Sequence, residues 1–102
     1  MYNDIKSTIL HERGFNMYCK EVTIMNQVGL HARPATYFIQ KANEFKEEIK
    51  VTKDEREVNG KSLLGVLSLG ITRGSSIKIS AVGENEEAAV EALVALVESN
   101  FE

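Results

Sequence analysis

The sequence predicts an α+β fold in which helices cover one face of an antiparallel sheet. Two observations carry this prediction. Four short segments alternate apolar and polar residues, as strands with one buried face do. Two longer segments repeat apolar residues at helical spacing, and a compact apolar segment between them predicts a third, shorter helix. Since all these elements have one apolar face to bury, the predicted order is β-α-β-β-α-β-α with the helices on one side.

Length and composition predict a single domain and exclude several classes of protein. With 102 residues, the chain can bury about two-thirds of its unfolded surface without disulfides or metals. A net charge of −3 without a long basic run argues against nucleic-acid binding. No apolar stretch approaches the roughly 20 residues of a membrane span, and no signal-peptide pattern opens the chain. Cys19 is the only cysteine, so we expect no disulfide, metal site or cofactor, and a cytoplasmic protein.

The first strand is expected at residues 18–25, and a helix follows from His31 to about Asn43. Pro34 is the only proline of the chain. It is tolerated in the first turn of a helix because an N–H there has no partner. One face of the strand should carry Tyr18, Lys20, Val22 and Ile24, with Cys19 an ordinary strand residue. The apolar positions of the helix, with Phe38 and Ile39 expected in the core, are Ala35, Phe38, Ile39, Ala42 and Phe45.

The next segment, residues 49–60, is expected to form two strands joined by a turn. Ile49 and Val51 alternate with polar residues, and the polar run 53–56 predicts the turn. The third strand is short and should end at Asn59-Gly60.

A short apolar helix is expected between Ser62 and Gly70, because serine is a favoured N-cap and glycine a favoured stop. A helix of two turns cannot bury every apolar side chain, since helical geometry turns about a third of them outward. We expect Leu64 to be exposed and to form a small docking patch with Leu63 and Leu67.

The last strand and helix follow from the same patterns. Ile77, Ile79 and Ala81 alternate with polar residues in the fourth strand. Asn85 is expected to cap the last helix, with two glutamates placed favourably in the first turn. The glutamates are Glu86 and Glu87, and the apolar stripe of this helix is Val90, Leu93, Val94, Val97 and Phe101, with Leu93 in the core.

The segment that carries the chemistry is Gly29-Leu30-His31-Ala32-Arg33-Pro34-Ala35-Thr36. It places His31 at or next to the N-cap of a helix, where unpaired amides and the helix dipole form an anion site. The dipole disfavours a positive charge on the ring, which should therefore be neutral and nucleophilic. Histidine is not a favoured cap. Together with Arg33, which suits phosphate geometry, His31 predicts a site for a phosphoryl group carried on histidine.

Two blocks, residues 29–36 and 61–70, resemble the histidine-containing phosphocarrier (HPr) family of the phosphoenolpyruvate-dependent sugar phosphotransferase system, Gram-positive type. The resemblance runs from about Met17 to the C-terminus, with both blocks in the expected order and spacing. It implies an open-faced β-sandwich with strand order 1-4-2-3, which periodicity alone cannot give. It also implies a monomeric phosphocarrier rather than a turnover enzyme.

The resemblance further implies roles for single residues and partners. His31 Nδ1 would accept a phosphoryl group from enzyme I and pass it to the IIA components of sugar permeases. Arg33 would neutralise the group, and the backbone amides of Ala32 and Arg33 would receive its oxygens. Partner docking would involve Leu63, Leu64, Leu67 and Thr36.

Ser62 resembles the regulatory serine that HPr kinase/phosphorylase modifies with ATP, and a catabolite-control transcription factor is a further partner of this type. Ser62 also suits the role of an ordinary helix N-cap, and the two roles are compatible. A phosphate at a helix N-terminus meets favourable dipoles, so we expect a change of surface charge with little change of fold.

Two alternatives to the sugar-branch carrier stay open. One is a regulatory binding module that acts through Ser62 phosphorylation; paralogues of that kind lack the active histidine, which here is present as His31. The other is a nitrogen-branch phosphocarrier, which the tail 95–101 resembles, although the block 61–70 is more like the sugar branch. Val28 stands where many relatives have a hydroxyl or amide residue, so one polar contact to the phosphoryl group is missing.

The extension, residues 1–16, is usually absent from this family, and we expect it to be poorly ordered and dispensable, with His11 solvated. Three interpretations compete. Residues 4–14 suit a short capped helix that needs docking, or the segment is a regulatory or targeting arm without a signal peptide's apolar core. Alternatively, Arg13-Gly14 back-translates to a purine-rich run like a ribosome-binding site, so that translation starts at Met17 and the extension is an artefact.

Overall fold

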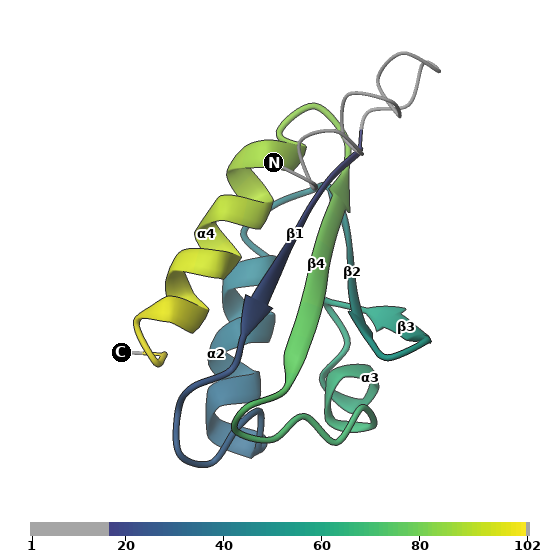
Figure 1. The fold of residues 1–102 in the computed structure, drawn as a ribbon. Coiled ribbons are helices and arrows are strands. Elements are labelled where there is room, and N and C mark those ends of the chain that lie inside the picture. The colour runs from purple at the N-terminus through teal and green to yellow at the C-terminus, as the bar shows by residue number, and fades with distance from the viewer. Residues whose placement is uncertain (1–16, 102) are drawn as a thin grey trace.

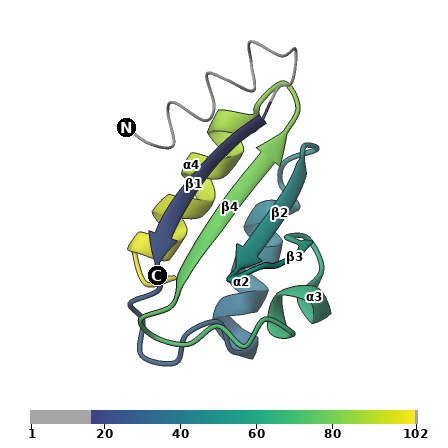
Figure 2. The same ribbon diagram turned by 45° about the vertical axis from the view of Figure 1, so that its right-hand side comes forward.

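The computed structural model describes residues 17–101 and has the element order that the sequence predicts. Four strands form one antiparallel sheet of order β1-β4-β2-β3, as expected (Figure 1). In Figure 2, the sheet faces the viewer with α2 and α4 behind it, whereas α3 lies beside β3. The predicted extension, residues 1–16, with His11, lies outside the described residues. Among the described helices, none combines the length and apolar character needed to cross a membrane.

The strands begin and end close to the predicted residues. They are β1 (Met17–Thr23), β2 (Glu48–Lys53), β3 (Arg56–Asn59) and β4 (Ser76–Val82). The first strand therefore ends two residues before the predicted Met25. The turn between β2 and β3 is also shorter than expected, because Lys53 pairs with Arg56 and leaves only two residues at the tip. Asp54 there adopts φ +57°, a conformation that aspartate tolerates in tight turns.

The helices are α2 (Ala32–Ala42), α3 (Leu63–Leu67) and α4 (Glu86–Glu98). The helix α3 is shorter than predicted. It ends at the C-cap Ser68, and Gly70 follows with φ +61° as the expected stop. Arg56 supports this end because its guanidinium donates to the carbonyl and hydroxyl oxygens of Ser68, over 2.8 and 3.1 Å.

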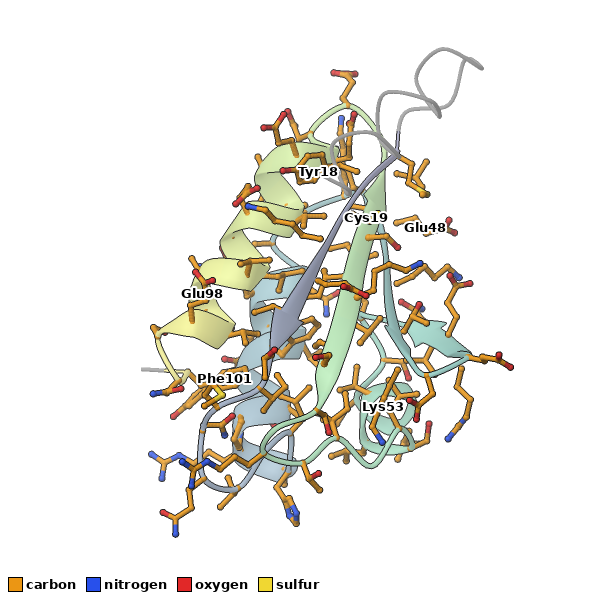
Figure 3. All side chains as sticks on the ribbon, in the orientation of Figure 1. Tyr18, Cys19, Glu48, Lys53, Glu98 and Phe101 are labelled. Carbon is orange, nitrogen blue, oxygen red and sulfur yellow. The ribbon has the colours of Figure 1, made fainter. Side chains whose placement is uncertain are left out.

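The core lies between the sheet and the pair α2 and α4, as the apolar patterns predict. Phe38 and Leu93 are fully buried there, against Ile49, Ile77 and Ile79 of the strands. Each such aliphatic side chain contributes about 1.5–3 kcal/mol to folding. Ile39, expected in the core, is only half-buried at its edge. Cys19 is a buried strand residue with a free thiol, as predicted (Figure 3).

The start of α4 differs from the prediction in one respect. Asn85 is the N-cap, and Glu86 and Glu87 are in the first turn, but the Asn85 side chain makes no capping bond. Instead, Oε2 of the buried Glu47 accepts a hydrogen bond from the Asn85 N–H over 3.1 Å. The capping acceptor comes from the loop before β2, 38 residues away in the chain, where local pattern reasoning cannot find it.

Candidate functional site

The start of α2 presents an exposed imidazole beside unused backbone donors. His31 is the N-cap, with extended backbone angles (φ −78°, ψ −174°) and no side-chain capping bond, as expected. The first intrahelical bond runs from the Ala35 N–H to the His31 carbonyl, over 2.8 Å. Pro34 has no N–H, so the amides of Ala32 and Arg33 are the donors that the helix leaves open. An anion bound beside His31 could accept hydrogen bonds from both amides.

A glycine holds this loop against the segment that follows α3. Gly29 has φ +66°, and a Cβ atom there would lie 2.5 Å from the Ile71 carbonyl oxygen. The same oxygen accepts a hydrogen bond from the Leu30 N–H, over 3.1 Å. On the other side, Asn26 Nδ2 donates to the Gly29 carbonyl over 2.8 Å. These bonds fix the backbone directly before His31, a function of Gly29 and Ile71 that the sequence pattern did not indicate.

Arg33 lies exposed on the first turn of α2 and is held by a tyrosine one turn later. Its Nε donates to the Tyr37 hydroxyl over 3.2 Å, and its Cζ lies 6.0 Å from the centre of the ring. The hydrogen bond to Tyr37 raises the pKa of Arg33 further above its already high value. The guanidinium is thus a permanent cation next to the open amides. No local pattern in the sequence indicates this role of Tyr37.

His31 and Arg33 line one hollow of about 790 Å³ together with residues from the C-terminal end. Asn100 and Phe101 follow α4 with φ of +58° and +65°, and these angles turn the chain after the helix. Phe101 is buried, but α4 ends at Glu98, so Phe101 lies beyond the helix and not on its apolar stripe as predicted (Figure 3). Val28 is about half exposed in the wall of the hollow and supplies no polar side-chain group, which fits the contact expected to be missing.

Ser62 is the N-cap of α3, as predicted, and its hydroxyl is already in use. Its Oγ accepts a hydrogen bond from the Gly65 N–H over 3.0 Å. The other end of α3 is close to His31, because Leu67, Thr72 and His31 line a second hollow, of about 160 Å³. The structure therefore brings α3 and the start of α2 to one face of the molecule.

The four residues expected to dock partners differ in exposure. Leu64 is 81% exposed and Leu63 is 38% exposed, so both are available at the surface. Leu67 is half-buried and packs against the core. Thr36 is half-buried, and its hydroxyl donates to the Ala32 carbonyl over 2.7 Å, within its own helix. Leu63 and Leu64 therefore form the exposed part of the predicted patch.

No metal site emerges from residues 17–101, because they contain no cluster of three or more His, Cys, Asp or Glu side chains that could hold an ion. The chemistry available at this face comes from an imidazole, a guanidinium, two backbone amides and a serine hydroxyl.

Comparisons with known proteins show which family this chain resembles. The family described as "PTS HPr component phosphorylation site" matches residues 18–99. The HPr-like protein Crh of Halalkalibacterium halodurans is 46% identical over 79 residues, which cover 78% of this chain and 94% of Crh. The phosphocarrier protein HPr of Haemophilus influenzae is also 46% identical, over 81 residues that cover 79% of this chain and 95% of HPr.

Solved structures agree with this sequence similarity. The crystal structure of HPr-C-His from Thermoanaerobacter tengcongensis is similar with a TM-score of 0.80 and 48% identity, over 81% of this chain and 93% of that one. HPr from Bacillus anthracis gives a TM-score of 0.77 and 46% identity, over 79% and 96% of the two chains. A similar chain of Bacillus subtilis Crh, with a TM-score of 0.67 and 37% identity over 81% and 95%, comes from a domain-swapped dimer.

Proposed function

Because this chain belongs to the HPr family of phosphocarrier proteins in the phosphotransferase system, we propose that His31 carries the phosphoryl group. In this proposal, His31 accepts the group from phosphorylated enzyme I in the cytoplasm and passes it to the IIA components of sugar permeases. The observation that carries the proposal is the open start of α2. An exposed imidazole, two unused amides and a held guanidinium meet at that point.

The transfer is an in-line exchange between two histidines of different proteins. The lone pair of a neutral His31 nitrogen, Nδ1 by family resemblance, attacks phosphorus while the bond from phosphorus to the donor histidine breaks. The other nitrogen of the His31 ring keeps its proton. In a second exchange of the same kind, a histidine of the acceptor protein attacks phosphorus, the bond from phosphorus to His31 breaks, and the carrier is restored. The chain is regenerated at each cycle, so it acts as a carrier rather than a turnover enzyme.

The residues around His31 are suited to the charge on the transferred group. The Ala32 and Arg33 amides can donate to phosphoryl oxygens, and the dipole of α2 favours negative charge at this end. The Arg33 guanidinium adds a fixed positive charge. Such groups act mainly by positioning and charge neutralisation, which are the main requirements of phosphoryl transfer.

Incubation with enzyme I and phosphoenolpyruvate tests this proposal. The wild-type chain should gain the mass of one phosphoryl group, and the gain should disappear in acid. His31→Ala should abolish the gain and leave the fold intact, and Arg33→Ala should slow it by about a hundredfold. His11→Ala, which removes the other histidine of the chain, is the matched control and should be labelled like the wild type. Acid-labile labelling of His31→Ala would overturn the proposal.

We further propose that HPr kinase/phosphorylase modifies Ser62 and that this modification slows transfer at His31. Ser62 Oγ already accepts the Gly65 amide, and phosphate oxygens can keep that role while adding negative charge near the docking patch. Ser62→Asp should raise the KM for enzyme I, whereas Thr52→Asp, on β2, should not. A Ser62→Asp variant that behaves like the wild type and a Ser62 that the kinase leaves unmodified would together exclude this regulation.

A regulatory module related to Crh is the second candidate, because Crh and HPr relatives are equally identical to this chain at 46%. Histidine at position 31 favours the carrier. A chain that enzyme I leaves unlabelled, but that the kinase modifies at Ser62, would favour the regulatory module. Labelling by a nitrogen-branch enzyme I in preference to the sugar-branch enzyme would identify the third alternative.

A further inference from the structure

Negative charge is absent from the two segments that form the end of the molecule around His31. Residues 22–43 and 58–83 contain no Asp or Glu, although the chain has 15 acidic residues. These segments include the loop before α2, the start of α2, all of α3 and the loop before β4, which lie at the lower end of Figure 1. Six acidic side chains lie at the opposite end, where α2 stops and α4 starts: Glu44, Glu47, Glu48, Glu84, Glu86 and Glu87. Three more, Asp54, Glu55 and Glu57, lie on the β2–β3 hairpin, which is beside α3.

Most cations of the acid-free segments already have a partner. Arg33 donates to Tyr37, Lys61 Nζ donates to the Phe45 carbonyl over 2.5 Å, and Lys41 lies 3.4 Å from a Glu44 carboxylate oxygen. Lys78 lies on β4, in register with Glu21 of β1. Neither the Lys78 nor the Arg73 side chain makes a hydrogen bond or ion pair with a residue that the structure describes, but Lys78 is half-buried on its strand whereas Arg73 is exposed.

Arg73 is also presented by a rigid turn. The Ser75 N–H donates to the Thr72 carbonyl over 3.0 Å, and Gly74 has φ +92°, which together define a type II turn with Arg73 in the first central position. The turn is tied to Ile24 by two backbone bonds, of 2.7 Å from Gly74 and 2.8 Å to Ser75. Because this backbone is already fixed by hydrogen bonds, only the Arg73 side chain has to be ordered when a partner binds it.

The turn adjoins the proposed transfer site. Thr72, its first residue, lines the same 160 Å³ hollow as His31. Thr72 also packs closely against Gly29, because a Cβ atom on Gly29 would lie only 2.7 Å from the Thr72 Cα. Glu98, the last residue of α4, and Glu21 line another hollow, which shares only Asn100 with the larger hollow beside His31. Arg73 directly follows Thr72 in the chain, and the hollow that Thr72 lines shares only His31 and Ala32 with the hollow of Arg33 and Tyr37.

We propose that Arg73 is a docking residue that pairs with carboxylates on the proteins exchanging the phosphoryl group with His31. This inference rests on the proposed function and adds a specific contact to it. The partner surface it fits is acidic at its rim, with an apolar centre for the exposed leucines of α3. The chain as a whole is negative, so an acidic partner meets less repulsion at the acid-free segments than elsewhere, and Arg73 helps to select the productive orientation.

Two charge reversals of equal size test the inference. Arg73→Glu and Lys46→Glu each lower the net charge by two, and Lys46 lies at the acidic end, in the loop after α2. With enzyme I and phosphoenolpyruvate, Arg73→Glu should raise the KM roughly fivefold with kcat unchanged, and the increase should shrink in high salt. Lys46→Glu should have the KM of the wild type, and Arg73→Lys should retain most of the affinity for enzyme I.

The outcomes separate this inference from the proposed function. If the wild-type chain is not phosphorylated at all, the proposed function fails. If the wild type is phosphorylated but Arg73→Glu and Lys46→Glu have the same KM, a charge at position 73 has no special effect and the inference is overturned. Loss of kcat in Arg73→Glu at unchanged KM would also overturn it, because a docking contact acts on association.

Discussion

Two helix starts in this molecule use the same backbone feature in opposite ways. At the start of α4, the buried Glu47 carboxylate accepts the Asn85 amide, and two glutamates occupy the first turn. At the start of α2, the first turn has no acid, the N-cap side chain makes no capping bond, and His31 is exposed. Both ends offer unpaired amides and positive dipole potential. The first is neutralised within the fold, and the second is left open to an external anion.

The start of α3 lies between these extremes. Ser62 caps its own helix through the Gly65 amide, yet it remains half-exposed on the face that carries Leu64. The three helix starts thus range from an anion site filled by Glu47 at α4, through the self-capped Ser62 at α3, to the open amides beside His31 at α2. Substitutions at Gly29 and Glu47 can break or sharpen this comparison, and a third, at Glu91, tests a contact of α4 away from its start.

The largest expected effect comes from Gly29→Ala, which disturbs the open start of α2. The new Cβ would lie 2.5 Å from the Ile71 carbonyl oxygen at φ +66°. We expect a loss of about 3 kcal/mol in the free energy of unfolding and slower labelling of His31. Gly70→Ala is the control, because Gly70 has a similar φ of +61° but open space around it. It should lose only about 1 kcal/mol. Equal losses in urea unfolding would show that the contact with Ile71 is unimportant.

Glu47→Ala should weaken the filled start of α4 and leave transfer unchanged. Removing a buried carboxylate that accepts the Asn85 amide over 3.1 Å should cost about 2 kcal/mol. Glu47→Gln keeps an acceptor oxygen and should lose less. Urea unfolding followed by circular dichroism measures both, alongside the rate of His31 labelling. A Glu47→Ala variant that is as stable as the wild type would remove the contrast between the two helix starts.

These two predictions depend on contacts that the sequence did not reveal. The elements, the core positions on the strands, and His31 at the start of α2 were predictable because they follow from periodicity and local capping rules. The Glu47–Asn85 bond, the Gly29–Ile71 contact and the C-terminal wall of the His31 hollow join residues far apart in the chain. Local patterns do not determine such contacts, since they depend on how the elements pack. For the same reason, Asn85 was expected to cap through its own side chain.

The smallest expected effect concerns the pH dependence of the contact between α4 and β1. Hydrogen bonds from Lys20 and Tyr18 lower the pKa of Glu91 below its ordinary value of 4.5. Because this pKa is lower in the folded state, the ionised Glu91 stabilises the fold fully at pH values above its unfolded-state pKa. This stabilisation is lost as the pH falls through the folded-state pKa. Glu91→Gln should therefore be less stable than the wild type at neutral pH. On acidification, its free energy of unfolding should fall by less than that of the wild type.

The size of this effect is limited by exposure, because the Lys20 and Glu91 side chains are 39% and 41% exposed. We expect less than about 1 kcal/mol at neutral pH, and little difference between the proteins once the pH is well below 4.5. Urea midpoints at neutral and acidic pH measure it. A wild-type midpoint that falls no more than that of Glu91→Gln would rule out this linkage.

The central claim, that the open start of α2 receives the phosphoryl group, is tested most directly by mapping the label in the unaltered chain. The protein is incubated with enzyme I and phosphoenolpyruvate, digested at alkaline pH to preserve phosphohistidine, and sequenced by mass spectrometry. The claim predicts one acid-labile phosphoryl group, on the peptide that contains His31. A group on the peptide with His11, or an acid-stable group on a serine with His31 unmodified, would contradict it.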